Sequence, residues 1–194
     1  MTTLVLGAAA GIALASALFL LVPGCGTPVT GRTFDPAAPV FPTVKGESLN
    51  NRAFTIPADL DAPFNVLLVA FYRGQQSQVD TWLPTARQII VDHANVEYYE
   101  MPTISGAWGV ARGWIDGGMR SGIPDFGARE RTVTIYTDTS KFRELAGIEN
   151  PEQIWVGLVD RAGRVYWSAR GPATEEALGD LRRVVRAVAS PAAP

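Results

Sequence analysis

The sequence predicts an α/β domain built on a mixed sheet, and three observations carry that prediction. An almost unbroken apolar run at residues 64–72 is typical of a central strand covered on both faces. Residues 77–94 have apolar side chains at helical spacing, and a second strand pattern follows at 96–101. The second half of the chain then has the order strand, short helix, strand, strand, helix. A βαβ unit followed by a ββα unit gives one sheet with helices on its faces.

Two further elements are predicted in the first half. Residues 41–60 are expected to form a hairpin with its turn near Asn50 and Asn51, because Asn tolerates the positive φ of a tight turn. Residues 107–122 place apolar side chains on one side and predict a helix, although five glycines lower its intrinsic helix propensity.

The second half contains three strand patterns and two helices. The strands are predicted at residues 132–136, 154–159 and 164–169. Asp138 or Thr139 is expected to cap a short helix that ends before Gly147. The last helix begins near Thr174 with two glutamates in its first turn and arginines towards its end, a charge order that complements the helix dipole.

Composition limits the possible functions. A length of 194 residues suits one domain with its own core, and no internal repeat is visible. The net charge of −2 gives no basic surface for nucleic acid. The chain has one cysteine, Cys25, and one histidine, His93. These counts exclude an internal disulfide, a cysteine-based zinc site and a two-cysteine redox couple, so we expect no metal and no cofactor.

The N-terminal segment indicates a membrane location. Residues 4–22 carry no charge over 19 positions, and Cys25 follows after Pro-Gly. Cys25 could be the diacylated residue of a bacterial lipoprotein signal, the segment could be an uncleaved helix with a GxxxG step at Gly7 and Gly11, or it could be a plain secretory signal. All three alternatives place the rest of the chain at or beyond a bacterial membrane, on the periplasmic or cell-surface side, and the first two attach it to the bilayer.

The chain therefore divides into three parts. Residues 1–25 form a signal peptide or membrane anchor. Residues 26–40 are rich in Pro and Gly and are expected to form an extended tether. Residues 41–190 form the folded domain.

The predicted order of elements is the thioredoxin arrangement, a three-layer α/β sandwich with a mixed central sheet, here with an N-terminal hairpin extension. In thioredoxin-like proteins the first strand-to-helix loop carries a Cys-x-x-Cys motif. Because Phe71 and Pro84 fix the alignment from both ends, Gln76 and Val79 stand at the two cysteine positions. A thiolate is the nucleophile of this chemistry, so we expect no thiol-disulfide exchange and no enzymatic activity. The cis-proline of the fold is displaced as well, with Pro151 the nearest proline.

The loop that replaces the motif is a candidate binding site. Its residues are Arg73, Gly74, Gln75, Gln76 and Gln78, at a predicted helix N-terminus where free backbone N–H groups favour an anion or a partner's carboxylate. A capped surface loop without a ligand remains the alternative.

The five tryptophans offer a second candidate surface. They could form a partner-binding aromatic face, but all lie in apolar periodic segments, so we expect most of them to be in the core. They are Trp82, Trp108, Trp114, Trp155 and Trp167.

The C-terminal part carries a family resemblance. A strand ends in Asp160, a turn leads to the segment RVYW with Trp167, and Gly171 precedes a helix start with the sequence Thr-Glu-Glu. Together with the segment FPTVKGESLNNRAFTIP, this resembles the mitochondrial ATP synthase assembly factor ten family and its bacterial relatives, over residues 41–187. The resemblance implies a redox-inactive thioredoxin-like protein that assists assembly of the ATP synthase membrane sector, with subunits of that complex as partners. The alternative is a periplasmic binding module for a small anion or peptide at the loop.

Overall fold

The computed structural model describes residues 32–33 and 40–189, and the predicted anchor with Cys25 lies outside them. Among the described residues no helix has both the length and the hydropathy needed to cross a bilayer. Two residues of the predicted tether, Arg32 and Thr33, form a short strand against the C-terminal hairpin.

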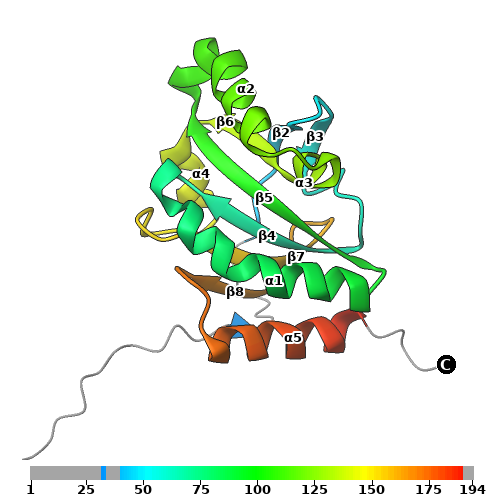
Figure 1. Ribbon diagram of the computed structural model, residues 1–194. Coiled ribbons are helices and arrows are strands. Elements are labelled where there is room, and N and C mark those ends of the chain that lie inside the picture. The colour runs from blue at the N-terminus through cyan, green and yellow to red at the C-terminus, as the bar shows by residue number, and fades with distance from the viewer. Residues whose placement is uncertain (1–31, 34–39, 190–194) are drawn as a thin grey trace, which may run out of the picture.

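Eight strands form one mixed sheet (Figure 1). They are β1 (Arg32–Thr33), β2 (Val44–Ser48), β3 (Ala53–Ile56), β4 (Phe64–Ala70), β5 (Val96–Ser105), β6 (Val133–Thr137), β7 (Trp155–Asp160) and β8 (Val165–Arg170). Their order across the sheet is β1-β8-β7-β4-β5-β6-β2-β3. β4, β5 and β6 run parallel, and every other neighbouring pair is antiparallel. The three parallel strands therefore end at the same edge of the sheet.

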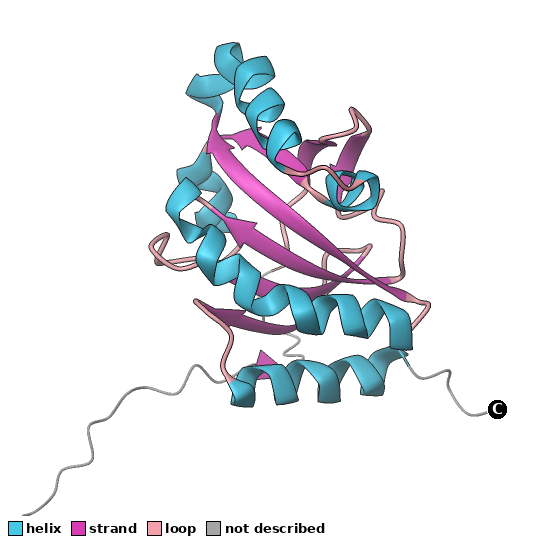
Figure 2. Ribbon diagram, viewed as in Figure 1, coloured by secondary structure: helices cyan, strands magenta, loops and turns pink. Residues whose placement is uncertain are grey.

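Helices lie on both faces of this sheet. They are η1 (Arg73–Gln75), α1 (Gln76–Asp92), η2 (Gly106–Ala111), α2 (Arg112–Gly122), α3 (Phe126–Arg131), α4 (Thr139–Leu145) and α5 (Glu175–Ala189). Figure 2 shows α1 and α5 side by side, and these two helices contact each other. α4 packs on the opposite face through Phe142. The predicted three-layer sandwich with a mixed central sheet is confirmed.

Two hydrophobic cores lie on the two faces. In the core under α1 and α5, the indole rings of Trp82 and Trp167 meet edge to face at 5.9 Å. In the core under α4, the ring of Phe142 lies 5.7 Å from that of Phe41 and 6.4 Å from that of Phe71. Because Phe71 follows β4 directly, this second aromatic cluster connects α4 to the loop at the end of β4.

The N-terminal hairpin is present as predicted. β2 and β3 pair with each other, and Asn51 in the turn has a φ of 66°. β2 also pairs with β6, which adds the hairpin to the edge of the sheet. A Cβ at Gly46 would lie 2.7 Å from Cγ1 of Val133, so the close approach of β2 to β6 requires glycine there.

The segment after β5 differs from the prediction. β5 continues to Ser105, and residues 107–122 split into η2 and α2. Trp108 is 60% exposed and Trp114 is 84% exposed, whereas the other three tryptophans are buried. Most of the five tryptophans are therefore in the core, as predicted. Trp108 and Trp114 are the exceptions, because no described element covers their rings.

Candidate functional site

Three segments meet where the parallel strands end. Residues 71–76 follow β4, η2 follows β5, and α4 begins directly after β6. In Figure 1 the arrows of β4 and β5 point to this end of the molecule, where α2 and α4 also lie. Loops that follow parallel strands are the usual place for binding groups in an α/β sheet. The predicted loop is therefore one part of a larger surface.

Gln75 holds the loop in place. Its side chain is buried, and its Oε1 accepts hydrogen bonds from the N–H of Phe71 at 2.8 Å and of Tyr72 at 3.2 Å. Its Nε2 donates to the carbonyl oxygen of Pro151 at 2.6 Å. The amide of Gln75 thus uses both ends within the fold, and it contributes rigidity to the site.

Gln76 and Gln78 tie the start of α1 to its surroundings. The Nε2 of Gln76 donates to Oδ1 of Asp80 at 2.9 Å and, at 3.5 Å, to Oε2 of Glu100. The Oε1 of Gln78 accepts from the N–H of Ile154 at 3.2 Å. The loop before β7 is therefore fixed against α1 by side-chain amides.

The loop before β7 has a trans peptide bond at Pro151, since the one cis bond among residues 32–33 and 40–189 is Ile56-Pro57. Val79, at the second cysteine position of the fold, is buried in the core under α1, whereas Gln76 at the first position is exposed. The one cysteine of the chain, Cys25, lies outside the described residues.

Arg73 and Gly74 are the open part of the predicted site. Both are exposed, and the side chain of Arg73 forms no hydrogen bond or ion pair with another described residue. A Cβ at Gly74 would meet no atom within 4 Å. α1 begins without a hydrogen bond from a capping side chain. The structure leaves these two residues accessible to a ligand and commits Gln75 and Gln78 to the fold.

A half-buried carboxyl lies beside Gln76. Partial burial raises the pKa of Glu100 above its usual range, and the nearby Asp80 carboxylate adds to this, whereas the hydrogen bond from Gln76 and the positive charge of Arg87 oppose it. Glu100 makes no ion pair in the described part of the chain. This carboxyl can therefore keep its proton at a higher pH than an exposed glutamate.

A groove of about 350 Å³ lies beside the loop. Its lining comes from all three segments and from the loop before β7: Phe71, Tyr72, Ile104, Ser105, Trp108, Thr139, Ser140, Arg143 and Pro151. Tyr72 is 51% exposed, so it and Trp108 present aromatic surface at the rim. Apart from Trp108, the sequence proposed none of these residues for a binding surface, because they converge only when β4, β5 and β6 are aligned.

A second cavity of about 400 Å³ lies between the β2–β3 hairpin, β6 and α2. Here Arg112 forms ion pairs with Glu47 at 3.1 Å and with Asp116 at 3.4 Å. The hydroxyl of Tyr136 donates to Oδ1 of Asp116 at 2.9 Å. The charge of Arg112 is therefore paired within the fold, whereas Lys45, which also lines the cavity, forms no ion pair with a described residue. In residues 32–33 and 40–189, no three His, Cys, Asp or Glu side chains lie close enough together to hold a metal ion.

Comparisons with known proteins agree with this architecture at low sequence identity. A DsbF homologue from Corynebacterium diphtheriae matches with a TM-score of 0.54 and 17% identity, over 84% of this chain and 95% of that one. A secreted thiol-disulfide isomerase from Corynebacterium glutamicum matches with a TM-score of 0.53 and 11% identity, over 86% of this chain and 95% of that one. BsSco, described as a member of the Sco family of cytochrome c oxidase assembly proteins, matches with a TM-score of 0.52 and 11% identity, over 78% of this chain and 96% of that one.

No protein-family model matches the chain, and no curated protein matches its sequence. The resemblance to the ATP synthase assembly factor family therefore remains a prediction.

The structural comparisons correct one expectation. The prediction that the chain is not an enzyme was wrong as an inference from Gln76 and Val79, because structures with this fold include a protein named as a thiol-disulfide isomerase, which is an enzyme. The two replaced positions remove a thiol from the loop, and they exclude no other activity. At this level of identity the comparisons establish the architecture, and the chain has a thioredoxin-like fold.

Proposed function

We propose that this chain is a membrane-attached, extracytoplasmic protein that binds a segment of a partner protein at the groove beside α4 and assists assembly of a membrane protein complex. The observation that carries this proposal is the groove itself. It is concave, partly apolar, and rimmed by Tyr72 and Trp108. Exposed aromatic side chains around a preformed depression are typical of protein-binding sites.

The rigidity of the loop supports partner binding. Gln75 and Gln78 fix the loop and the segment before β7, so the groove wall is formed before a partner arrives. A preformed site loses less conformational entropy on binding than a flexible one.

The proposed location and client rest on the sequence and on the named neighbours. Residues 4–22 are uncharged and precede Cys25, as in a lipoprotein signal or an anchor helix. One structural neighbour is named as secreted, and another is named as a member of a family of cytochrome c oxidase assembly proteins. The sequence resemblance makes the membrane sector of ATP synthase the client that we propose.

Site-specific photocrosslinking tests this function. A benzophenone amino acid placed at Trp108 of the full chain, in native membranes, should crosslink to a subunit of ATP synthase or of another respiratory complex. The matched control is the same probe at Val91, which is 78% exposed near the far end of α1. Recovery of no such subunit at position 108, or equal recovery at both positions, would refute the proposal.

The membrane attachment has its own test. The intact mass of the protein extracted from membranes distinguishes a diacylated chain that starts at Cys25 from an uncleaved N-terminal helix. A soluble chain cleaved elsewhere would contradict the proposed attachment.

A second candidate function is a binding module for a small anion or peptide at the loop. The observation that favours it is the side chain of Arg73, which is exposed and has no partner among the described residues, beside a start of α1 that has no capping side chain. Substituting Arg73 and Gln76 together should abolish this function. An unchanged phenotype would argue against it and leave the groove as the proposed site.

A further inference from the structure

The groove beside α4 has an unbalanced charge. Its lining contains one cationic side chain, Arg143, and no carboxylate. The guanidinium of Arg143 donates to the carbonyl oxygen of Glu149 at 3.3 Å and forms no ion pair with a described residue. A cation that lines a depression without a counter-ion favours an anionic ligand.

Asp138, the residue directly before α4, does not supply this counter-ion. Oδ1 of Asp138 accepts hydrogen bonds from the N–H of Ser140 at 3.0 Å and of Lys141 at 3.1 Å. Asp138 therefore caps α4 and is absent from the groove lining. The N–H groups of Ser140 and Lys141 are used by this cap, which leaves Arg143 as the charged anion-binding group of the groove.

The rest of the lining combines apolar side chains with serine and threonine hydroxyls. Phe71, Ile104 and Pro151 form the inner wall, and Tyr72 and Trp108 form the rim. A volume of about 350 Å³ is at the small end of the range for ligand pockets, and it accommodates one large side chain with its backbone.

We propose that this groove recognises a peptide segment in which an aromatic or large aliphatic side chain stands next to a carboxylate. The apolar wall takes the side chain, and Arg143 binds the carboxylate. A planar guanidinium matches a carboxylate in two parallel hydrogen bonds, which a neutral amide cannot form with it. This inference rests on the proposed function and names the chemistry of the partner segment.

Two matched small probes test the carboxylate preference. N-acetyl-L-phenylalanine carries a ring and a carboxylate, and its amide carries the same ring without the charge. Each is titrated against the full chain in detergent micelles, and binding is followed by the NMR signal of the Trp108 indole N–H, identified by its loss in Trp108→Phe. The acid should bind about fivefold more tightly than the amide, because a hydrogen bond to a charged group is stronger than a neutral one.

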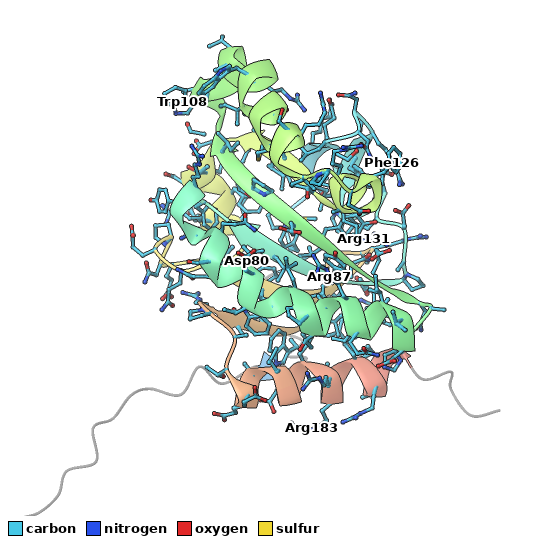
Figure 3. The ribbon with its side chains drawn as sticks, in the orientation of Figure 1. Asp80, Arg87, Trp108, Phe126, Arg131 and Arg183 are labelled. Carbon is cyan, nitrogen blue, oxygen red and sulfur yellow. The ribbon has the colours of Figure 1, made fainter. Side chains whose placement is uncertain are left out.

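Substitution at Arg143 assigns the preference. Arg143→Gln should make the two probes bind equally, and Arg143→Lys should keep part of the difference. The matched control is Arg183→Gln, the same charge change on α5, where Arg183 pairs with Asp180 at 2.7 Å. Figure 3 shows Arg183 at the opposite end of the molecule from Trp108, so this variant should keep the full preference.

Several outcomes would overturn the inference. They are equal binding of acid and amide to the unmodified chain, binding of neither, and a preference that survives in a folded Arg143→Gln variant. If Arg143→Gln does not fold, a reduced preference in Arg143→Lys together with the full preference in Arg183→Gln supports the inference, and any other pattern refutes it. Crosslinking from position 108 to a membrane complex is a separate readout, so the proposed function can stand when this inference fails.

Discussion

The two cavities of the molecule differ in how their charges are arranged. In the larger one, Arg112 is neutralised by Glu47 and Asp116. In the smaller groove, Arg143 has no carboxylate partner among the described residues, and the wall is held by the neutral amide of Gln75. Lys45 also lines the larger cavity and forms no ion pair with a described residue, so the contrast is between the two arginines. Arg112 is held by carboxylates of the fold, whereas Arg143 is an unpaired charge beside apolar surface and is available to a ligand.

The largest expected effect is at Gln75. Gln75→Ala removes three hydrogen bonds and leaves the N–H of Phe71 and Tyr72 without their partner. We expect a loss of about 2 to 3 kcal/mol in the free energy of unfolding, measured by urea denaturation. The control Gln76→Ala, at an exposed position, should change it by less than about 0.5 kcal/mol. A loss of unfolding free energy in Gln75→Ala as small as that in Gln76→Ala would show that the groove wall does not depend on Gln75.

Asp116 tests the larger cavity. Asp116→Ala leaves the hydroxyl of Tyr136 unpaired and removes one of two ion pairs of Arg112. The expected loss is about 1 to 2 kcal/mol of unfolding free energy, because Asp116 is buried. Glu144→Ala, which removes an exposed carboxyl from α4, is the control and should have no measurable effect. If Asp116→Ala does not change the unfolding free energy, the charges around Arg112 do not stabilise the fold, and the difference between the two cavities is not the one described above.

Glu100 extends the comparison to a half-buried carboxyl that forms no ion pair with a described residue. Burial raises its pKa in the folded state, so between its unfolded and its folded pKa the native state binds more protons than the unfolded state. Stability contributed by this group is therefore present below the unfolded pKa and is lost as the pH rises through the folded pKa. Glu100→Gln should flatten this fall in urea unfolding measured from pH 4 upwards. If the pH dependence of the unfolding free energy is the same in Glu100→Gln and in the unmodified chain, the pKa of Glu100 is not raised by folding.

Arg143 should give the smallest effect on stability. Arg143→Gln removes one long hydrogen bond to a backbone oxygen and no ion pair. The unfolding free energy should stay within about 0.5 kcal/mol of the unmodified chain, by the same urea measurement. A larger loss would mean that Arg143 belongs to the fold in the way that Arg112 does.

The helices and strands could be predicted from local sequence patterns. The residues that come together at the ends of the parallel strands could not be predicted in this way. The apolar run of β4 and the periodicity of α5 each contain their own signal, so both were located within a few residues. The continuation of β5 through Pro102 was missed, because a proline interrupts the pattern although this residue pairs with Ala70 of β4.

The candidate site was predicted only in part. The loop from Arg73 to Gln78 was found by its position after β4, but periodicity does not show that the side chain of Gln75 turns inward. The sequence predicted correctly that most of the tryptophans are in the core, but it did not show that Trp108 is an exception, because its segment is apolar on one side. Arg143 lies some seventy residues from the loop in the chain, and only the alignment of β4 with β6 through β5 brings the two segments to one groove.

The attachment of α4 has a consequence for local motion. A helix of seven residues is too short to persist by itself, and α4 is held by the ring of Phe142 against Phe41 and Phe71. The N–H of Phe142 donates to the carbonyl oxygen of Asp138, and the N–H of Ala146 donates to that of Phe142. These two amide protons should therefore exchange with solvent as slowly as those of the core strands. The wall that carries Arg143 would then open only when the aromatic cluster beneath it opens.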